Sequence, residues 1–264
     1  MTTAEGNRHP TGYFLSELAE PAQQLEAAGV KLVFATPGGV TPTMDVVSDA
    51  AKWFDNDKGQ LAAARAFVAD RLRPESVVDL ARLDESDLAE FAGVTFPGGH
   101  APMEDLSRDP DVARTLHHFH EHGKPTGLIC HGPAALLATE PFLYAGYRLT
   151  AFSTAEERQE EDAGHLDGHM PFYLDQALSM RGAILETGAP WASEAIRDRE
   201  LVTGRNPFSH KAFGVLFLEA LAERALGTAK VRTFAGGLEP GVKTVVIPPA
   251  AVATGLSGSV AGAR

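Results

Sequence analysis

The sequence contains a single cysteine, Cys130, among its 264 residues. One cysteine excludes an intramolecular disulfide framework and fits the reducing cytoplasm. No apolar run approaches the ~18 residues of a membrane span. The first ten residues, Met1 to Pro10, also lack the apolar core of a signal peptide. We therefore expect a cytoplasmic protein without a membrane partner.

Basic residues are also scarce, because 23 Lys and Arg residues face 35 Asp and Glu residues and give a net charge of −12. A nucleic-acid partner would need a concentrated basic face, so we expect none. With 44% hydrophobic and 22% charged residues, the composition is that of a soluble globular protein. The length is sufficient for one full α/β core, in one or two domains.

The stretch around Cys130 has the pattern of a strand, a tight turn and a helix. An apolar run over residues 127–129 leads into Cys130, and good helix formers follow Pro133 over residues 134–138. Because Pro133 suits the first helical position, the unpaired N–H groups and the dipole of the helix would point back at Cys130 and lower its pKa. The alternative is a buried, inert cysteine, the commoner fate of a lone cysteine.

Helical and strand patterns fill most of the remaining chain. Periodic apolar residues and their stop signals predict helices over residues 13–28, 61–72, 111–122, 171–180 and 207–226. Strands are expected over residues 31–35, 93–96, 147–151 and 183–186, with a hairpin-like pair around residues 198–200. The acidic segment over residues 156–162 is typical of a solvated surface, with one of its members as an exception.

Two pairs of histidines have a spacing that suits a metal ion. His118 and His122 share a helical face at i,i+4, and His165 and His169 have the same spacing. A third ligand is not evident for either pair. We therefore predict no metal site and no cofactor.

Six segments carry a resemblance to a known family: residues 12–21, 35–39, 96–100, 130–134, 170–172 and 201–207. In this order, over roughly residues 10 to 225, they resemble the ThiJ/PfpI superfamily, which is class I glutamine amidotransferase-like. Within it the chain is similar to the branch of stress-response glyoxalase III and chaperone proteins. The pair Cys-His-Gly-Pro-Ala and Pro-Gly-Gly-His is the most specific part of the match.

The resemblance implies a flavodoxin-like three-layer α/β sandwich with a mostly parallel sheet and Cys130 at a nucleophile elbow. His131 matches the catalytic histidine of the family. Glu17 matches the glutamate that hydrogen-bonds the cysteine sulfur, a task that requires a carboxyl protonated part of the time and therefore a buried one. The backbone N–H groups of Gly99 and His131 would form the oxyanion hole.

The third triad member implied by the resemblance is an acid that follows the next strand. Glu157 is the best match and Glu156 is a close second. Either carboxylate would orient the imidazole of His131 and stabilise its protonated form.

The activity implied by the resemblance is a cofactor-independent glyoxalase III reaction. Cys130 would add to a small 2-oxoaldehyde such as methylglyoxal, form a hemithioacetal, and release a 2-hydroxy acid, D-lactate. A homodimer is the family expectation. Two alternatives stay open: a stress-response holdase chaperone or thiol oxidation sensor acting through Cys130, and a cysteine hydrolase acting on an amide or related C–N bond.

The domain organisation expected from the resemblance is an α/β domain over residues 1–228 and a C-terminal extension over residues 229–264. Family members open with a buried strand at the centre of the sheet, and no residues here match it. Either the natural chain begins further upstream, or another segment fills the position. We hypothesise that the β-branched run over residues 242–248 is the replacement strand, followed by a disordered tail of small residues.

Overall fold

The computed structural model describes residues 1–225 and 241–250. Its centre is a seven-stranded sheet with the order β2-β1-β9-β3-β4-β8-β7, in which all neighbours are parallel except β7 and β8. The strands are β1 Lys31–Thr36, β2 Val77–Asp79, β3 Gly93–Phe96, β4 Thr126–Ile129, β7 Ala195–Asp198, β8 Leu201–Gly204 and β9 Lys243–Val246. A smaller parallel pair joins β5 Arg148–Leu149 to β6 Ile184–Leu185.

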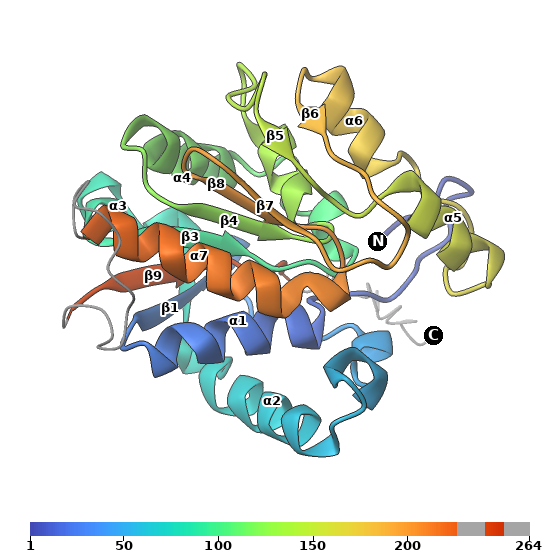
Figure 1. Cartoon of the computed structure of the whole chain (residues 1–264), viewed down its shortest axis with the longest axis horizontal. Coiled ribbons are helices and arrows are strands. Elements are labelled where there is room, and N and C mark those ends of the chain that lie inside the picture. Colours follow the sequence, from blue (N-terminus) through green and yellow to red (C-terminus); the bar gives the residue numbers. More distant parts are fainter. Residues whose placement is uncertain (226–240, 251–264) are drawn as a thin grey trace, which may run out of the picture.

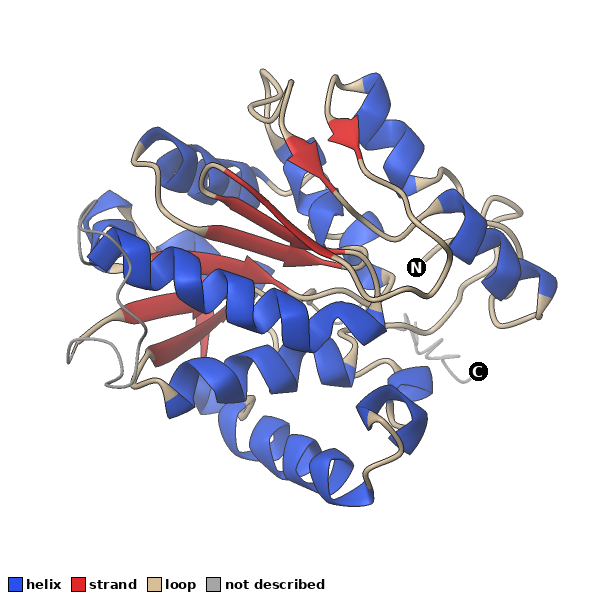
Figure 2. Cartoon of the chain, in the orientation of Figure 1, coloured by secondary structure: helices blue, strands red, loops and turns tan. Residues whose placement is uncertain are grey.

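Helices cover both faces of the large sheet and complete a three-layer sandwich (Figures 1 and 2). One face carries α1 Leu15–Ala27 and α7 His210–Ala225, with α2 Lys58–Arg71 packed outside α1. The opposite face carries α3 Glu85–Glu90, α4 Pro110–Glu121 and the 3₁₀ helix Gly132–Ala138. The helices α5 Thr154–Asp162 and α6 Leu174–Met180 lie at the carboxyl end of the parallel strands. This arrangement confirms the predicted flavodoxin-like α/β fold class.

The strand β9 occupies the centre of the sheet, between β1 and β3. Val245 pairs with Val33 on one side and with Val94 on the other. Thr244 and Val245 are fully buried, and beyond the strand the N–H of Ile247 donates to Thr95 O at 2.8 Å. The structure thus places a strand from the expected 242–248 segment in the middle of the sheet. Described residues before and after the predicted domain boundary at residue 228 therefore share one core.

Successive side chains of β9 and of Ile247 after it point to opposite faces of the sheet and pack in both hydrophobic layers, as expected for a strand buried on both faces. Val245 and Ile247 pack in the cluster that includes Phe119 of α4. Val246 packs in the cluster that includes Leu15 and Leu18 of α1. The expected disordered tail, apart from Ala250, lies outside the described residues. Among the helices of the described ranges, none is long and apolar enough to cross a membrane.

Several elements differ from their predictions. The segment after Cys130 forms a 3₁₀ helix, Gly132–Ala138, in place of the expected α-helix. The acidic segment is helical in α5, because Ser153 and Glu156 form a capping box at its start. The expected strands at residues 147–151 and 183–186 shorten to the two-residue strands β5 and β6.

Candidate active site

Cys130 stands at a sharp turn directly after β4, with a φ of +62°. This left-handed conformation is uncommon for a residue with a side chain, and it is typical of a nucleophile at a strand-to-helix elbow. Two backbone hydrogen bonds hold the turn: Cys130 N donates to Gly204 O at 2.9 Å, and Phe152 N donates to Cys130 O at 2.9 Å. A side chain at Gly132 would lie 2.2 Å from Phe96 O, so only glycine permits this close approach.

His131 connects the sulfur of Cys130 to the carboxylate of Glu157. Its Nδ1 lies 3.3 Å from Sγ, and its Nε2 lies 2.6 Å from Oε2 of Glu157 in the first turn of α5. Because an ionised carboxylate only accepts hydrogen bonds, the proton of the neutral imidazole sits on Nε2. The unprotonated Nδ1 then faces the thiol, which is the geometry of a cysteine, base and orienting acid. All three side chains are at most 3% exposed.

Glu156, the other acid considered from the sequence, is directed elsewhere. Its carboxylate accepts hydrogen bonds from Ser153 N at 3.0 Å, Trp191 N at 2.8 Å and Asn206 Nδ2 at 2.7 Å. It therefore ties the start of α5 to two neighbouring loops. Of the two acids, the structure brings only Glu157 to His131.

Glu17 lies in the first turn of α1 and is 2% exposed. Gly98 N donates to its Oε2 at 3.0 Å, whereas the buried Oε1 makes no hydrogen bond to a described residue. Burial raises the pKa of Glu17 to about 8, against smaller opposing effects of Cys130 and the Gly98 N–H. The carboxyl is therefore mostly protonated at neutral pH, as the proton-sharing task of this position requires.

Gly98 is the point where these groups meet. A Cβ atom there would lie 2.6 Å from Glu17 Oε2 and 2.7 Å from Cys130 Cβ. The absence of a side chain lets the carboxyl and the thiol pack against the same backbone segment. Glu17, near the amino end of the chain, thus becomes a neighbour of Cys130.

The pKa of Cys130 is raised, so the predicted lowering by a helix N-terminus is wrong. Complete burial is the largest cause, and the carboxyl groups of Glu17, Glu157 and Glu156 act in the same direction. The element that follows is a 3₁₀ helix of seven residues, Gly132–Ala138, and not the predicted α-helix. The thiol is therefore neutral at rest and needs a base, the position that His131 Nδ1 occupies.

The predicted oxyanion hole consists of two backbone N–H groups. Neither the Gly99 N–H nor the His131 N–H donates a hydrogen bond to another described residue. Gly99 has a φ of +84°, and a Cβ there would lie 2.0 Å from Gly12 O, so the loop requires glycine. A Cβ at Gly98 would lie 2.9 Å from His131 N, which brings the two predicted donors to the same region. Such backbone donors can hold a developing oxyanion.

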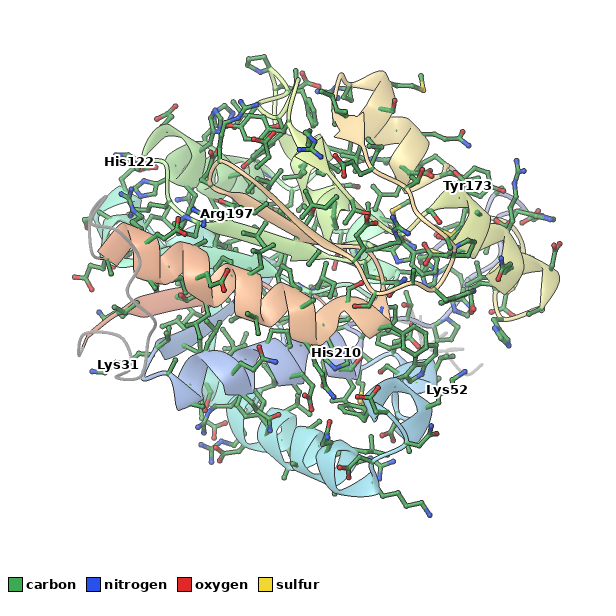
Figure 3. The ribbon with its side chains drawn as sticks, in the orientation of Figure 1. Lys31, Lys52, His122, Tyr173, Arg197 and His210 are labelled. Carbon is green, nitrogen blue, oxygen red and sulfur yellow. The ribbon has the colours of Figure 1, made fainter. Side chains whose placement is uncertain are left out.

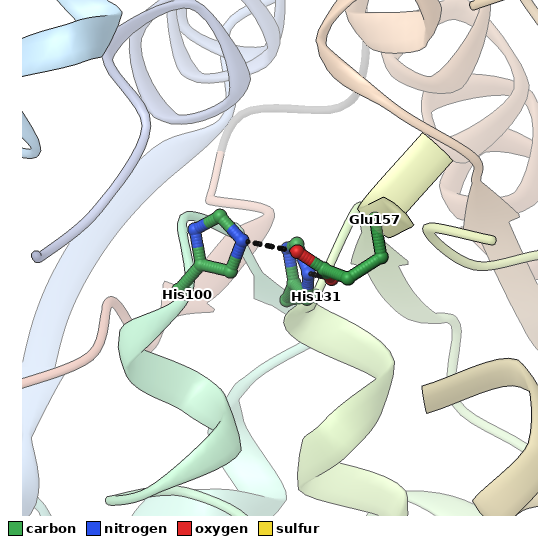
Figure 4. A group of neighbouring side chains, drawn as sticks. All are labelled: His100, His131 and Glu157. Atoms are coloured by element: carbon green, nitrogen blue, oxygen red, sulfur yellow. Dashed lines mark hydrogen bonds and ion pairs between the residues drawn. The ribbon is translucent and has the colours of Figure 1, made fainter. Parts of the chain in front are cut away.

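His100 received no role from the sequence, yet it contacts the same carboxylate as His131. Its Nε2 lies 2.8 Å from Oε1 of Glu157, and the two imidazole rings are 4.1 Å apart between centroids (Figure 4). A signal was present, because His100 closes the Pro-Gly-Gly-His segment after β3, the strand that pairs with β4. The carboxyl ends of adjacent parallel strands lie at one edge of the sheet, where ligands bind in open α/β sheets.

The same three residues are the group in the described ranges whose donor atoms could hold a metal ion, since these atoms lie within 4.8 Å of one another. A cation there would have to displace both hydrogen bonds to Glu157. The histidine pairs considered from the sequence do not form such a group. The rings of His118 and His122 stack with their centroids 4.4 Å apart. Figure 3 shows His122 at the opposite end of the molecule from the labelled residues Tyr173 and Lys52.

A pocket opens over the sulfur and encloses about 470 Å³ of empty space, its mouth included. Cys130, His131, His100 and Gly99 form its catalytic part, and its walls come from distant segments that include His9, Trp53, Phe152, Glu160, His165 and Trp191. None of these wall residues was predicted from the sequence to take part in substrate binding. Trp191 has a φ of +63° and is held by Glu156 through its N–H and by Gln159 through its indole N–H at 2.7 Å. The pocket is thus small and largely aromatic, and two hydrogen bonds hold Trp191 in its wall.

The chain is similar to several known proteins. The family model described as "DJ-1/PfpI family" matches residues 11–220. The chain is 28% identical over 220 residues to "Protein/nucleic acid deglycase HchA" of Escherichia coli O7:K1, covering 82% of this chain and 75% of that protein.

Solved structures share the fold of this chain, among them the following two. Glyoxalase III from Candida albicans has a TM-score of 0.62 and 21% identity, over 83% of this chain and 91% of that one. The Rapid Encystment Protein 24 KDa of Francisella tularensis has a TM-score of 0.67 and 21% identity, over 83% of this chain and 94% of that one.

Proposed function

The chain belongs to the DJ-1/PfpI family, and from this premise we propose that it converts small 2-oxoaldehydes to 2-hydroxy acids, methylglyoxal to D-lactate in particular, without a cofactor. The observation that carries the proposal is the thiol of Cys130 with the unprotonated Nδ1 of His131 at 3.3 Å. A buried carboxyl, Glu17, lies beside them. Nucleophile, base and proton carrier then suffice for an internal oxidation and reduction of the substrate.

In the first step Sγ of Cys130 attacks the aldehyde carbon, C1. The S–H proton moves to His131 Nδ1, and the C=O electron pair moves to O1 to give a hemithioacetal alkoxide. The N–H groups of Gly99 and His131 bind this oxygen. The imidazolium of His131 is stabilised by Glu157, which accepts its Nε2–H at 2.6 Å.

In the second step a proton moves from C1 to C2. Glu17 in its carboxylate form removes the C1 proton, the C1–C2 double bond forms, and the former ketone oxygen, O2, takes a proton from an acid. Glu17 then delivers its proton to C2, and the O1 electron pair closes the thioester carbonyl. With a pKa of about 8, roughly a tenth of the Glu17 side chains are carboxylates at pH 7. C1 is oxidised and C2 reduced, so no external oxidant is needed.

In the third step water attacks the thioester carbon, and one of its protons returns to the acid that protonated O2 in the second step. The Cys130 sulfur leaves and recovers its proton from His131, which returns to its neutral form. The product is the 2-hydroxy acid, and the resting state of the site is restored.

The test is D-lactate formation from methylglyoxal by the purified chain, without glutathione or added metal. We expect turnover that is lost in Cys130→Ala and reduced at least about 100-fold in Glu17→Gln. A folded wild-type protein without turnover would refute the proposal. The holdase, sensor and hydrolase alternatives would then have to be examined, and Cys130→Ser separates them because a holdase does not need the nucleophile.

A second candidate is the release of methylglyoxal from adducts with thiols or amines, suggested by the relative named as a protein and nucleic acid deglycase. The same thiol would capture the aldehyde carbon and the same proton transfers would follow. Preformed hemithioacetals of a small thiol distinguish the two substrates. A rate that follows the concentration of free methylglyoxal supports the glyoxalase, and a rate that follows the adduct supports the deglycase.

A further inference from the structure

One carboxylate in this site serves two imidazoles. Oε1 of Glu157 contacts Nε2 of His100 at 2.8 Å, and Oε2 contacts Nε2 of His131 at 2.6 Å. Figure 4 shows the carboxylate of Glu157 directed at both rings, with a dashed line to His100. A single negative charge can fully compensate only one imidazolium. The carboxylate therefore compensates at most one extra proton on the pair, and the ring that carries this proton decides the chemistry of the pocket.

The two histidines differ in what their second nitrogen faces. Nδ1 of His131 lies 3.3 Å from the sulfur of Cys130, so any proton that it carries comes from the thiol and returns to it. Nδ1 of His100 makes no hydrogen bond to another described residue, and its ring lines the pocket. The side chain of His100 is 14% exposed, compared with 1% for His131. His100 can therefore exchange a proton with a bound substrate or water.

Charges around the two rings favour a proton on His100 over a proton on His131. Burial lowers the pKa of His100, but the attraction and hydrogen bond of Glu157, with weaker attraction from Asp45 and Glu160, raise it above its usual value. The pKa of His131 is lowered by burial and by repulsion from His100, against the attraction of Glu157.

The imidazoles of His9 and His165 line the same pocket as His100. Glu17 also senses His100, and its carboxyl is mostly protonated. These charges therefore favour the shared proton on His100 over His131, beside the carboxylate of Glu157.

We propose that His100 is a second catalytic histidine, the acid that protonates the ketone oxygen of the substrate and then the base that activates water. This inference rests on the proposed function, because it assigns the acid that the second step leaves open. Glu157 remains a carboxylate throughout and pairs with whichever imidazole is charged.

The proton balance closes over one turnover. Attack by Cys130 transfers the thiol proton to His131, and protonation of O2 discharges His100, so the positive charge passes from one ring to the other across Glu157. In hydrolysis, neutral His100 takes a proton from water as the hydroxyl adds to the thioester carbon. The leaving sulfur takes its proton from His131. Both rings return to their starting states, and the remaining water proton leaves with the carboxylic acid.

The experiment compares wild type, His100→Gln and His120→Gln with methylglyoxal as substrate. Glutamine at position 100 can donate to Glu157 but cannot transfer a proton. The matched control also loses an imidazole bonded to a glutamate, since His120 Nδ1 lies 2.8 Å from Glu200, but it lies outside the pocket. For His100→Gln we expect kcat at least about 100-fold lower with KM changed by less than about threefold, and a pH–kcat profile without the descending limb due to the His100 imidazolium. His120→Gln should stay within about threefold of wild type.

Two further readouts separate catalysis from a structural effect. The rate of Cys130 alkylation by iodoacetamide should change less than about threefold in His100→Gln, because the contact between His131 and the thiol remains. His100→Ala should recover activity on addition of imidazole, which also covers poor folding of the glutamine variant. An active wild type with kcat and pH profile unchanged in His100→Gln overturns the role of His100 alone. A folded but inactive wild type overturns the proposed function and this assignment with it.

Discussion

Replacing Val245 by alanine tests whether β9 holds the centre of the sheet. The side chain is fully buried, lies in the cluster that contains Phe119 of α4, and its backbone pairs with both Val33 and Val94. A buried strand with neighbours on both edges cannot relax toward solvent when a side chain is shortened. The cavity left by the substitution should therefore persist.

The expected cost follows from the carbon atoms removed. Valine to alanine removes two carbon groups, worth about 0.8 kcal/mol each on burial. A cavity that does not collapse adds to this loss and brings the total to about 2–3 kcal/mol. For a chain of this size that corresponds to a melting temperature lower by roughly 4–12 °C. Val46→Ala is the matched control, because Val46 is 75% exposed and should cost less than about 0.5 kcal/mol.

Equilibrium unfolding in urea, followed by far-ultraviolet circular dichroism, measures both variants against wild type. We expect a lower midpoint for Val245→Ala with an unchanged slope, since the surface exposed on unfolding is almost the same. A midpoint as close to wild type as that of Val46→Ala would refute the placement of β9 between β1 and β3.

The remaining predictions concern the site. Glu157→Gln should lower kcat at least about 100-fold, whereas Glu156→Gln should mainly lower the unfolding midpoint, because Glu156 ties loops together and does not contact His131; equal losses of kcat would contradict this division. The folded-state pKa of Glu17, about 8, lies above its unfolded value, so its contribution to stability is complete below about pH 4.5 and is lost as the pH rises toward 8. Glu17→Gln should therefore show a smaller fall in unfolding free energy between pH 5 and pH 8 than wild type. Alkylation of Cys130 by iodoacetamide should keep accelerating through pH 9, because burial raises the pKa of this thiol; a plateau near neutral pH would contradict that.

The parts of the site that could be predicted from the sequence are those that depend on the local conformation of the backbone. The elbow at Cys130 follows from an apolar strand, a small residue at Gly132 and a proline at the start of the next helix. Glu17 and Glu157 came from resemblance, and the structure brings both to the cysteine and histidine. What separated Glu157 from Glu156 was the direction of each side chain on α5, which follows from the capping box at Ser153. Two consecutive glutamates cannot be distinguished before the phase of the helix is known.

Properties set by contacts between distant segments could not be predicted in the same way. The pKa of Cys130 depends on burial and on carboxyl groups from α1 and α5. A prediction from the local helix terminus alone therefore gave a lowered pKa where the pKa is raised. His100 was visible in its motif, but its contact with Glu157 joins a loop after β3 to a helix that begins beyond β5. The walls of the pocket combine segments around His9, Trp53 and Trp191. Each of these depends on the packed fold.

The position of β9 links the sheet to the two halves of the candidate site. β3 leads to Gly99 and His100, and it is held between β9 on one side and β4 on the other. β4 leads to Cys130, and its other neighbour is β8. Loss of β9 would leave one edge of β3 unpaired but both edges of β4 paired. Weakening β9 should therefore displace His100 and the Gly99 donor before it disturbs the contact between Cys130 and His131, because the strand that carries the nucleophile keeps both of its neighbours.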